Sequence, residues 1–311
     1  MAALNLGKRV IEFLQEKKDE TFTGREIAQA IFERFPDECA EKKAASTGQY
    51  MHTDADVVQQ LAAEISGSRP RWQKQHAQLK TTEGRPRHYY WTDKDDDAEV
   101  AAAESPTLVL VAKPGESPKL TEHALYPMLA VYLLEEHGVH ASRIDEKTSS
   151  NKSGSGANEW LHPDIVGLED LSSGWTRELR ECVRELAERR ARLWSFEVKV
   201  LLNRSNVRKS YFQAVSNSSW ANFGYLVAEK IEGDDTMKEL TMLAATHGIG
   251  VIHLDSATPS ESQILIPARE RANIDWDMCN RLTAENKDFV SYVERVKHFY
   301  QTGKVNKAEW A

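Results

Sequence analysis

Two short acidic segments contain the residue types that could hydrolyse a phosphodiester bond. Asp164 follows Pro163 in the first segment, and Glu197 and Lys199 flank Val198 in the second. Both segments have the short apolar pattern of β-strands. Because side chains on a strand alternate between its faces, Glu197 and Lys199 are expected to point the same way. Two carboxylates can hold a hard cation such as Mg²⁺ through oxygen, and a lysine can orient or deprotonate the attacking water. The pattern therefore predicts metal-dependent phosphodiester cleavage.

Length and composition are those of an ordinary protein with two domains. The 311 residues are enough for two cores, at about 150 residues each. No apolar run reaches the roughly twenty residues needed to span a bilayer, and the first residues lack the pattern of a secretory signal. The cysteines Cys39, Cys182 and Cys279 are scattered and lack the spacing of a zinc site. We therefore expect a cytoplasmic protein that does not contact the membrane.

The charge of the chain is unevenly distributed. A formal net charge of −8 does not indicate nucleic-acid binding, yet DNA contacts need only a local basic patch. Two such patches occur, one near residue 80 and one just after Lys199. The cations that we expect to contact DNA are Lys80, Arg85, Arg87, Arg204, Arg208 and Lys209. For the last three, a solvated helix face is the alternative interpretation.

Residues 1–92 are predicted to begin with two helices. Apolar residues spaced along 6–14 indicate the first helix. Thr23 and Glu26 form a capping-box pattern that opens the second helix. That helix is expected to end at Phe35, because Pro36 cannot continue it.

A third helix and a hairpin complete this N-terminal domain. Thr53 or Asp54 is the expected N-cap of the third helix, which should end near Gly67 and Pro70. Residues 76–91 contain a Gly-Arg-Pro turn between two short β segments, which is typical of a hairpin. Three helices followed by a hairpin is the order of a winged helix.

A linker and a second domain follow. Residues 93–118 are rich in acids, alanine and proline, which predicts a linker, with a short strand over 107–112. Residues 119–311 alternate helices and strands, which predicts an α/β domain with a mixed sheet. We expect helices over 121–137, 203–217, 235–246 and 275–302, strands over 224–228, 249–254 and 264–266, and a charged helix or insertion over 175–192.

The N-terminal domain resembles the HARE-type winged-helix modules of bacterial restriction-associated proteins. The resemblance rests on Thr-Phe-Thr-Gly-Arg-Glu-Ile-Ala at 21–28, a Phe-Pro pair, Gln-Leu-Ala-Ala-Glu-Ile at 60–65 and Arg-His-Tyr-Tyr-Trp at 87–91. It implies DNA binding tied to DNA modification. The expected third helix departs from a typical recognition helix, because it carries acids and neither lysine nor arginine. The hairpin with Arg85 and Arg87 is therefore the expected DNA contact, and protein binding is the alternative.

The second domain resembles the PD-(D/E)xK nucleases in the order and placement of Asp164, Glu197 and Lys199. The helix after them carries Gln213, where family members similar to archaeal junction resolvases and Mrr-type nucleases often have a glutamine. The helix before them carries Glu122, where such families often have another acid. Residues 160–229 are similar to the C-terminal domain of HrgA-like bacterial proteins, and the order of the two domains agrees with that family.

The resemblance and the chemistry together imply a role for each residue. Asp164, Glu197 and the carbonyl of Val198 would bind the metal, and Lys199 would position the water and balance charge on the phosphate. Gln213 would hold the phosphate or the lysine, unless it is a helix cap or a polar core residue. Glu122 would bind a second metal or the water, unless it only caps its helix. His162 would share the face of Asp164, where a structural role is favoured over contact with the phosphate.

The expected function is that of an endonuclease dependent on Mg²⁺ or Mn²⁺, with a winged helix that selects DNA, in restriction or phage defence. A homodimer is expected, because cutting both strands with one active site per chain generally needs two chains. One alternative is a non-catalytic DNA-binding regulator that retains the nuclease fold. Another is a nuclease for RNA or branched DNA whose winged helix binds protein.

Overall fold

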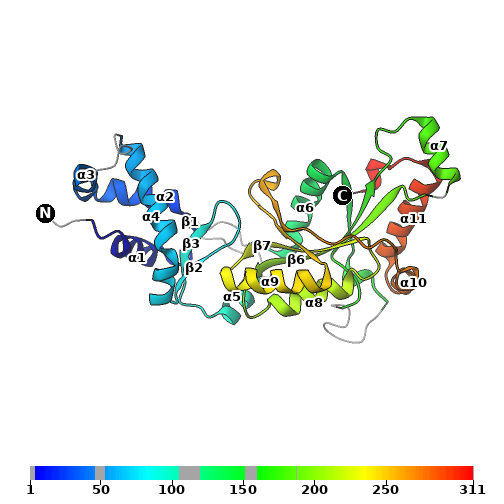
Figure 1. The fold of residues 1–311 in the computed structure, drawn as a ribbon. Helices are drawn as coiled ribbons and strands as arrows, with labels where there is room; N and C mark the ends of the chain where they lie inside the picture. The colour runs from blue at the N-terminus through cyan, green and yellow to red at the C-terminus, as the bar shows by residue number, and fades with distance from the viewer. Residues whose placement is uncertain (1–3, 46–52, 105–119, 151–159, 187, 311) are drawn as a thin grey trace. The chain divides into compact units, whose positions relative to one another are not determined.

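The computed structural model describes residues 4–45, 53–104, 120–150, 160–186 and 188–310 (Figure 1). The chain divides into two compact units, one of residues 1–98 with 232–234, and one of residues 99–231 with 235–311. The strand expected over 107–112 lies outside the described residues. None of the described helices is long and apolar enough to cross a membrane.

The described residues of the first unit up to Trp91 form four helices and a three-stranded antiparallel sheet with the order β1-β3-β2. The elements are α1 Leu6–Glu16, β1 Phe22–Thr23, α2 Gly24–Arg34, α3 Pro36–Ala45, α4 Asp54–Gln75, β2 Leu79–Thr81 and β3 His88–Trp91. The expected hairpin is confirmed as β2 and β3. The helices α2 and α4 each begin with a capping box, formed by Thr23 with Glu26 and by Thr53 with Asp56. Thr53 rather than Asp54 therefore caps α4.

Two helix boundaries in the first unit differ from the prediction. Pro36 does end α2, but it also opens α3, because a proline at the first helical position lacks only an N–H that would have no partner. The third helix does not end near Gly67; α4 continues through Pro70 to Gln75. Ile65, Arg69 and Trp72 lie on its buried side, and their burial offsets the roughly 3 kcal/mol that an interior proline costs.

The longer α4 also corrects the charge expected for this helix. Its last two turns carry Arg69, Arg71 and Lys74, so the third helix is not free of cations. Arg69 is buried, while Arg71 and Lys74 are exposed. The hairpin is therefore not the only part of this unit that offers positive charge.

The expected linker is helical in its first part, where α5 spans Asp96–Glu104. Beyond it, the second unit is built on a six-stranded mixed sheet with the order β4-β5-β6-β7-β8-β9, which confirms a mixed α/β fold. Its strands are β4 Val139–Arg143, β5 Ile165–Asp170, β6 Ala191–Leu202, β7 Phe223–Ile231, β8 Gly250–His253 and β9 Gln263–Ile266. The pairs β6–β7 and β7–β8 are parallel, and the other three pairs are antiparallel. The strand β4 was not predicted.

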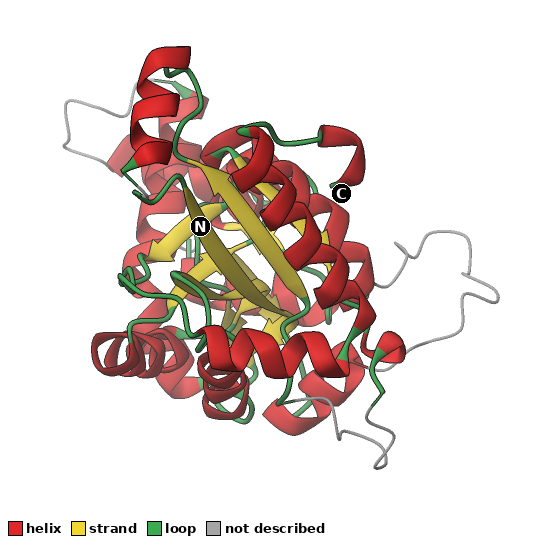
Figure 2. Ribbon diagram, turned by 90° about the vertical axis from the view of Figure 1, so that its right-hand side faces the viewer, coloured by secondary structure: helices red, strands yellow, loops and turns green. Residues whose placement is uncertain are grey.

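Helices lie beside this sheet, as Figure 2 shows in red against the yellow strands. They are α6 Glu122–His137, α7 Arg177–Glu185, α8 Val207–Asn217, α9 Asp234–His247, α10 Trp276–Glu285 and α11 Lys287–Thr302, with short 3₁₀ turns at Glu146–Thr148, Pro259–Glu261 and Lys307–Glu309. The expected C-terminal helix is two helices, because the Asn286 side chain accepts hydrogen bonds from Asp288 and Phe289 and starts α11. The charged segment before β6 contains α7.

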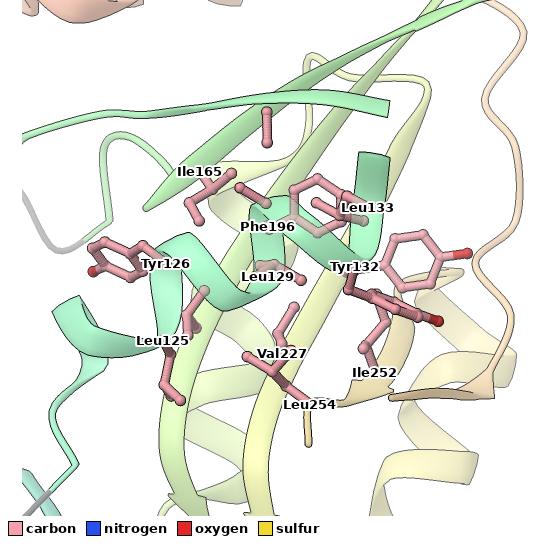
Figure 3. Packing of buried hydrophobic residues seen from close by; sticks show 14 of the residues in the cluster. Leu125, Tyr126, Leu129, Tyr132, Leu133, Ile165, Phe196, Val227, Ile252 and Leu254 are labelled. Atoms are coloured by element: carbon pink, nitrogen blue, oxygen red, sulfur yellow. The ribbon is translucent and has the colours of Figure 1, made fainter. Parts of the chain in front are cut away.

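The central strand β6 separates two apolar layers. Phe196, Val198 and Val200 pack with α6 on one face of the sheet, in the cluster that Figure 3 shows. Leu226 and Ala228 of β7 pack with α8 and α9 in another cluster. The alternation predicted for β6 therefore holds, since Glu197 and Lys199 lie between the apolar residues that face α6.

Candidate active site

The site forms where β5 begins beside the middle of β6. Ile165 pairs with Phe196 at the start of β5, so Asp164 lies just outside the strand rather than within it as expected. Pro163 has no N–H to donate to a ladder, which explains why the pairing does not extend further back. Asp164 instead reaches β6 with its side chain, because the Val198 N–H donates to its Oδ2 at 2.8 Å.

Lys199 links the carboxylates that come from two elements. Its Nζ lies 2.9 Å from Oε1 of Glu197 and 3.5 Å from Oε1 of Glu122, the first residue of α6. Glu197 is 2% exposed and Lys199 is 9% exposed, so this ion pair lies inside the protein. The structure therefore brings together Glu122, Asp164, Glu197 and Lys199, the four charged residues expected at the site.

Two further side chains join the cluster, and neither was expected from the sequence. The Tyr126 hydroxyl donates to Oδ1 of Asp164 at 3.1 Å, and the Asn217 amide donates to Oε2 of Glu197 at 3.0 Å. Tyr126 follows Glu122 by one helical turn, and Asn217 follows Gln213 by one turn. The i,i+4 spacing could have drawn attention to them. Gln213 is buried on α8, but Asn217 is the residue whose amide reaches Glu197.

The charges of the cluster do not balance. Burial, followed by the charge of Asp164, raises the pKa of Glu197 to about 8. Burial raises the pKa of Glu122 to about 7, with Lys199 acting in the opposite direction and Asp164 in the same one. Burial alone would lower the pKa of Lys199, but Glu197, Asp164 and Glu122 together raise it above its usual value. Three carboxylates therefore compete for one ammonium group.

This surplus of carboxyl groups over ammonium groups suits a divalent cation, whose charge would favour the ionised carboxylates. Within the described parts of the chain, no three His, Cys, Asp or Glu side chains meet as a metal-binding group. Magnesium, however, is commonly held by one or two carboxylates together with water and substrate phosphates. Asp164 and Glu197 can supply two such carboxylates. The Val198 carbonyl faces the same edge of β6 as its N–H, which points to Asp164, so the expected third ligand also fits.

His162, for which the sequence favours a structural role, lies two residues before Asp164 and close to the site. It is buried, and among the described residues its Nε2 has no hydrogen-bond partner. Burial lowers its pKa, which keeps the ring neutral near pH 7. It lies in the turn before β5 rather than on a strand with Asp164.

The six cations expected to contact DNA differ in their surroundings. Lys80 is only 8% exposed and its Nζ lies 2.6 Å from Asp96, so its position does not suit a surface contact. Arg87 pairs with Glu83, and Arg208 pairs with Glu239, each at 2.6 Å. Arg85, Arg204 and Lys209 are exposed. A count of basic residues along the chain could not reveal these ion pairs.

The N-cap of α6 controls where Glu122 and Tyr126 lie. The Thr121 hydroxyl accepts a hydrogen bond from the Ala124 N–H at 3.3 Å. We expect Thr121→Ala to lower the free energy of unfolding by about 1 kcal/mol and to weaken divalent-cation binding. Urea unfolding and a Mn²⁺ titration would measure the two effects. Thr176→Ala, which removes the corresponding cap of α7, should leave Mn²⁺ binding unchanged; an equal loss of binding in both variants would contradict the expectation.

No protein-family model, no curated protein and no solved structure matches the chain. The case for a function therefore depends on the geometry and charge of the cluster.

Proposed function

We propose that the protein is a metal-dependent DNA endonuclease whose second unit has the PD-(D/E)xK architecture. The observation that carries the proposal is the cluster of Glu122, Asp164, Glu197 and Lys199, in which Glu197 and Lys199 are buried and the other two are partly buried. They come from three segments that are far apart in the sequence: α6, the turn just before β5, and β6. Burying an unbalanced set of charges is costly, which favours a role beyond stability.

The side chains of the cluster would divide the work of hydrolysis. A bound Mg²⁺ or Mn²⁺ would polarise the phosphate and lower the pKa of a water molecule. Asp164 and Glu197 would hold the ion, with the Val198 carbonyl beside them. Lys199 stays protonated, since its pKa is raised, so it would orient the water and stabilise negative charge rather than act as the base. Glu122, with a pKa of about 7, is the better acceptor for a proton.

The first unit would select the DNA as a HARE-type winged helix. Its helices and three-stranded sheet support this assignment, as do the exposed cations Arg71 and Lys74 on α4 and Arg85 in the hairpin. Modified DNA is the proposed target, in restriction or phage defence. The proposal includes a cytoplasmic homodimer, which gel filtration would test.

Asp164→Asn tests the proposal most directly. We expect the wild type to nick or cut DNA with Mg²⁺ or Mn²⁺. The variant should cut more than about 100-fold more slowly, because the loss of a metal ligand should reduce activity at least as much as the loss of a residue that hydrogen-bonds to a ligand. The assay would use plain, methylated and hydroxymethylated DNA, with EDTA as the metal-free reference.

Asp170→Asn provides the matched control. Asp170 is the last residue of β5, the strand that begins just after Asp164, and it accepts hydrogen bonds from Ser172, away from the cluster. The Asp170→Asn variant should cut DNA at the wild-type rate. If the wild type and Asp164→Asn were equally inactive on all three DNAs, the nuclease proposal would be untenable.

One observation favours the alternative of a non-catalytic DNA-binding regulator. Both oxygens of Asp164 and both oxygens of Glu197 already accept hydrogen bonds from the protein. These hydrogen bonds satisfy the carboxylates without a bound metal, as a purely structural cluster would require. Tight DNA binding that neither requires Mg²⁺ nor leads to cleavage would support this alternative.

A further inference from the structure

Helix α6 presents a tyrosine to the cluster as well as a glutamate. The Tyr126 side chain lies one turn after Glu122, and its hydroxyl donates to Oδ1 of Asp164 at 3.1 Å. Tyr126 is 7% exposed, so water does not compete freely for this hydrogen bond. Figure 3 shows Tyr126 on α6 at the edge of the apolar cluster, beside Leu125 and Leu129.

The Asp164 carboxylate needs such a partner to have a defined orientation. The terminal torsion of an aspartate is broad, so the backbone alone does not set the plane of the carboxylate. Asp164 also lies just outside β5. Its Oδ2 is held by the Val198 N–H and its Oδ1 by Tyr126. Two donors from two elements thus fix the plane of one carboxylate.

The Tyr126 ring is itself held in place. The guanidinium carbon of Arg143 lies 5.3 Å from the ring centroid, and the His123 ring lies 5.4 Å away. A tyrosine hydroxyl has an ordinary pKa of about 10, so Tyr126 keeps its proton and remains a donor at neutral pH. The Tyr126 hydroxyl is therefore held in position and stays available as a hydrogen-bond donor.

We infer that Tyr126 is a positioning residue that orients the Asp164 carboxylate to bind a divalent cation. The inference depends on the proposed function, because it assumes that Asp164 is a metal ligand. Residues that hydrogen-bond to a metal ligand reduce the freedom lost when the metal binds, and their loss typically lowers metal affinity 10- to 100-fold. A purely structural hydroxyl would affect stability and leave metal affinity unchanged.

Tyr126→Phe tests the inference without removing the ring. We expect calorimetric titration of the full-length variant with Mn²⁺ to give an affinity about tenfold lower than that of the wild type. The Mn²⁺ concentration for half-maximal cleavage should rise in parallel, while DNA affinity measured without metal should stay the same.

Tyr132→Phe is the matched control on the same helix. Tyr132 is 4% exposed, and its hydroxyl lies 3.0 Å from Nε2 of His137 rather than near the carboxylates. Both variants should lose about 1 kcal/mol of stability, because each loses one buried hydrogen bond. Only Tyr126→Phe should lose Mn²⁺ affinity.

The possible outcomes separate the inference from the proposed function. If the wild type binds Mn²⁺ and cuts DNA, and Tyr126→Phe binds Mn²⁺ as tightly or more tightly, the inference is overturned while the nuclease proposal stands. If both tyrosine variants lose affinity equally, Tyr126 has no special role. If the wild type binds no Mn²⁺, both the inference and the proposed function fail.

Discussion

Replacing Lys199 by alanine is expected to reduce DNA cleavage by about 10²- to 10³-fold, the usual cost of removing one group that stabilises charge in a transition state. The same change should destabilise the fold by about 3–5 kcal/mol well above pH 8, where Glu197 remains as a buried charge without its partner, since the loss of Lys199 raises the pKa of Glu197 further. Lowering the pH to about 6 should restore part of this stability, because Glu197, whose pKa is about 8, is then protonated. Cleavage assays and urea unfolding at both pH values would measure these effects.

Lys230→Ala is a suitable control for the loss of a lysine. Lys230 is half-exposed and lies 3.8 Å from Glu229, so its loss should cost less than about 1 kcal/mol and leave cleavage unchanged. Combining Lys199→Met with Glu197→Gln should recover stability without recovering activity, since the buried charges are removed together. Cleavage by Lys199→Ala at the wild-type rate would rule out the proposed role of this lysine.

The metal-free protein is expected to lose stability as the pH rises from 6.5 to 8.5. Glutamate in an unfolded chain has a pKa of about 4.3, whereas the folded values are about 7 for Glu122 and about 8 for Glu197. A carboxyl whose pKa is raised by folding favours the folded state at low pH, and that contribution is lost progressively as the pH rises from the unfolded value through the folded value. The loss should be on the order of a few kcal/mol, and Mg²⁺ should reduce it.

Urea unfolding in EDTA over this pH range would measure the slope. Buried histidines such as His162, whose pKa is lowered, act in the opposite direction, but mainly below about pH 6.5. Glu197→Gln should flatten the curve. Glu169→Gln, which alters a partly exposed pair with Arg192, should not. Stability that stayed constant or rose over this range would show that the carboxylates are not held as described.

Local rules were sufficient to predict part of the site. Alternation along a strand put Glu197 and Lys199 on the same side, and their 2.9 Å contact confirms it. The contact between Asp164 and β6 depends on the pairing register of β5 with β6, which the alternation of residues along one strand does not predict. The resemblance to PD-(D/E)xK nucleases supplied that expectation instead. The mixed sheet of the second unit followed from the helix and strand pattern, although β4 did not.

Tertiary packing decided the features that the sequence could not. In the sequence, Tyr126 reads as one of the apolar residues of α6. Its role depends on the tertiary contact of its hydroxyl with Asp164. The helix α4 continues through Pro70 because buried residues on both sides hold it. Lys80 belongs to a basic run in the sequence, yet it is buried and pairs with the partly exposed Asp96. In each case a partner distant in sequence or a buried face outweighed the local pattern.

Most residues of the site lie on β6 and α6, and these two elements differ in their resistance to local opening. Glu197 and Lys199 lie in β6, which is paired with β7 along its length, so separating their backbone requires breaking the centre of the sheet. Glu122 and Tyr126 lie on α6, which covers one face of that sheet. A brief detachment of α6 would free Oδ1 of Asp164 and remove Glu122 from Lys199, while the hydrogen bond from Val198 to Asp164 and the ion pair on β6 remained intact. Slow amide exchange in β6 and faster exchange in α6 would then mark a protein that remains folded but is intermittently unable to bind metal.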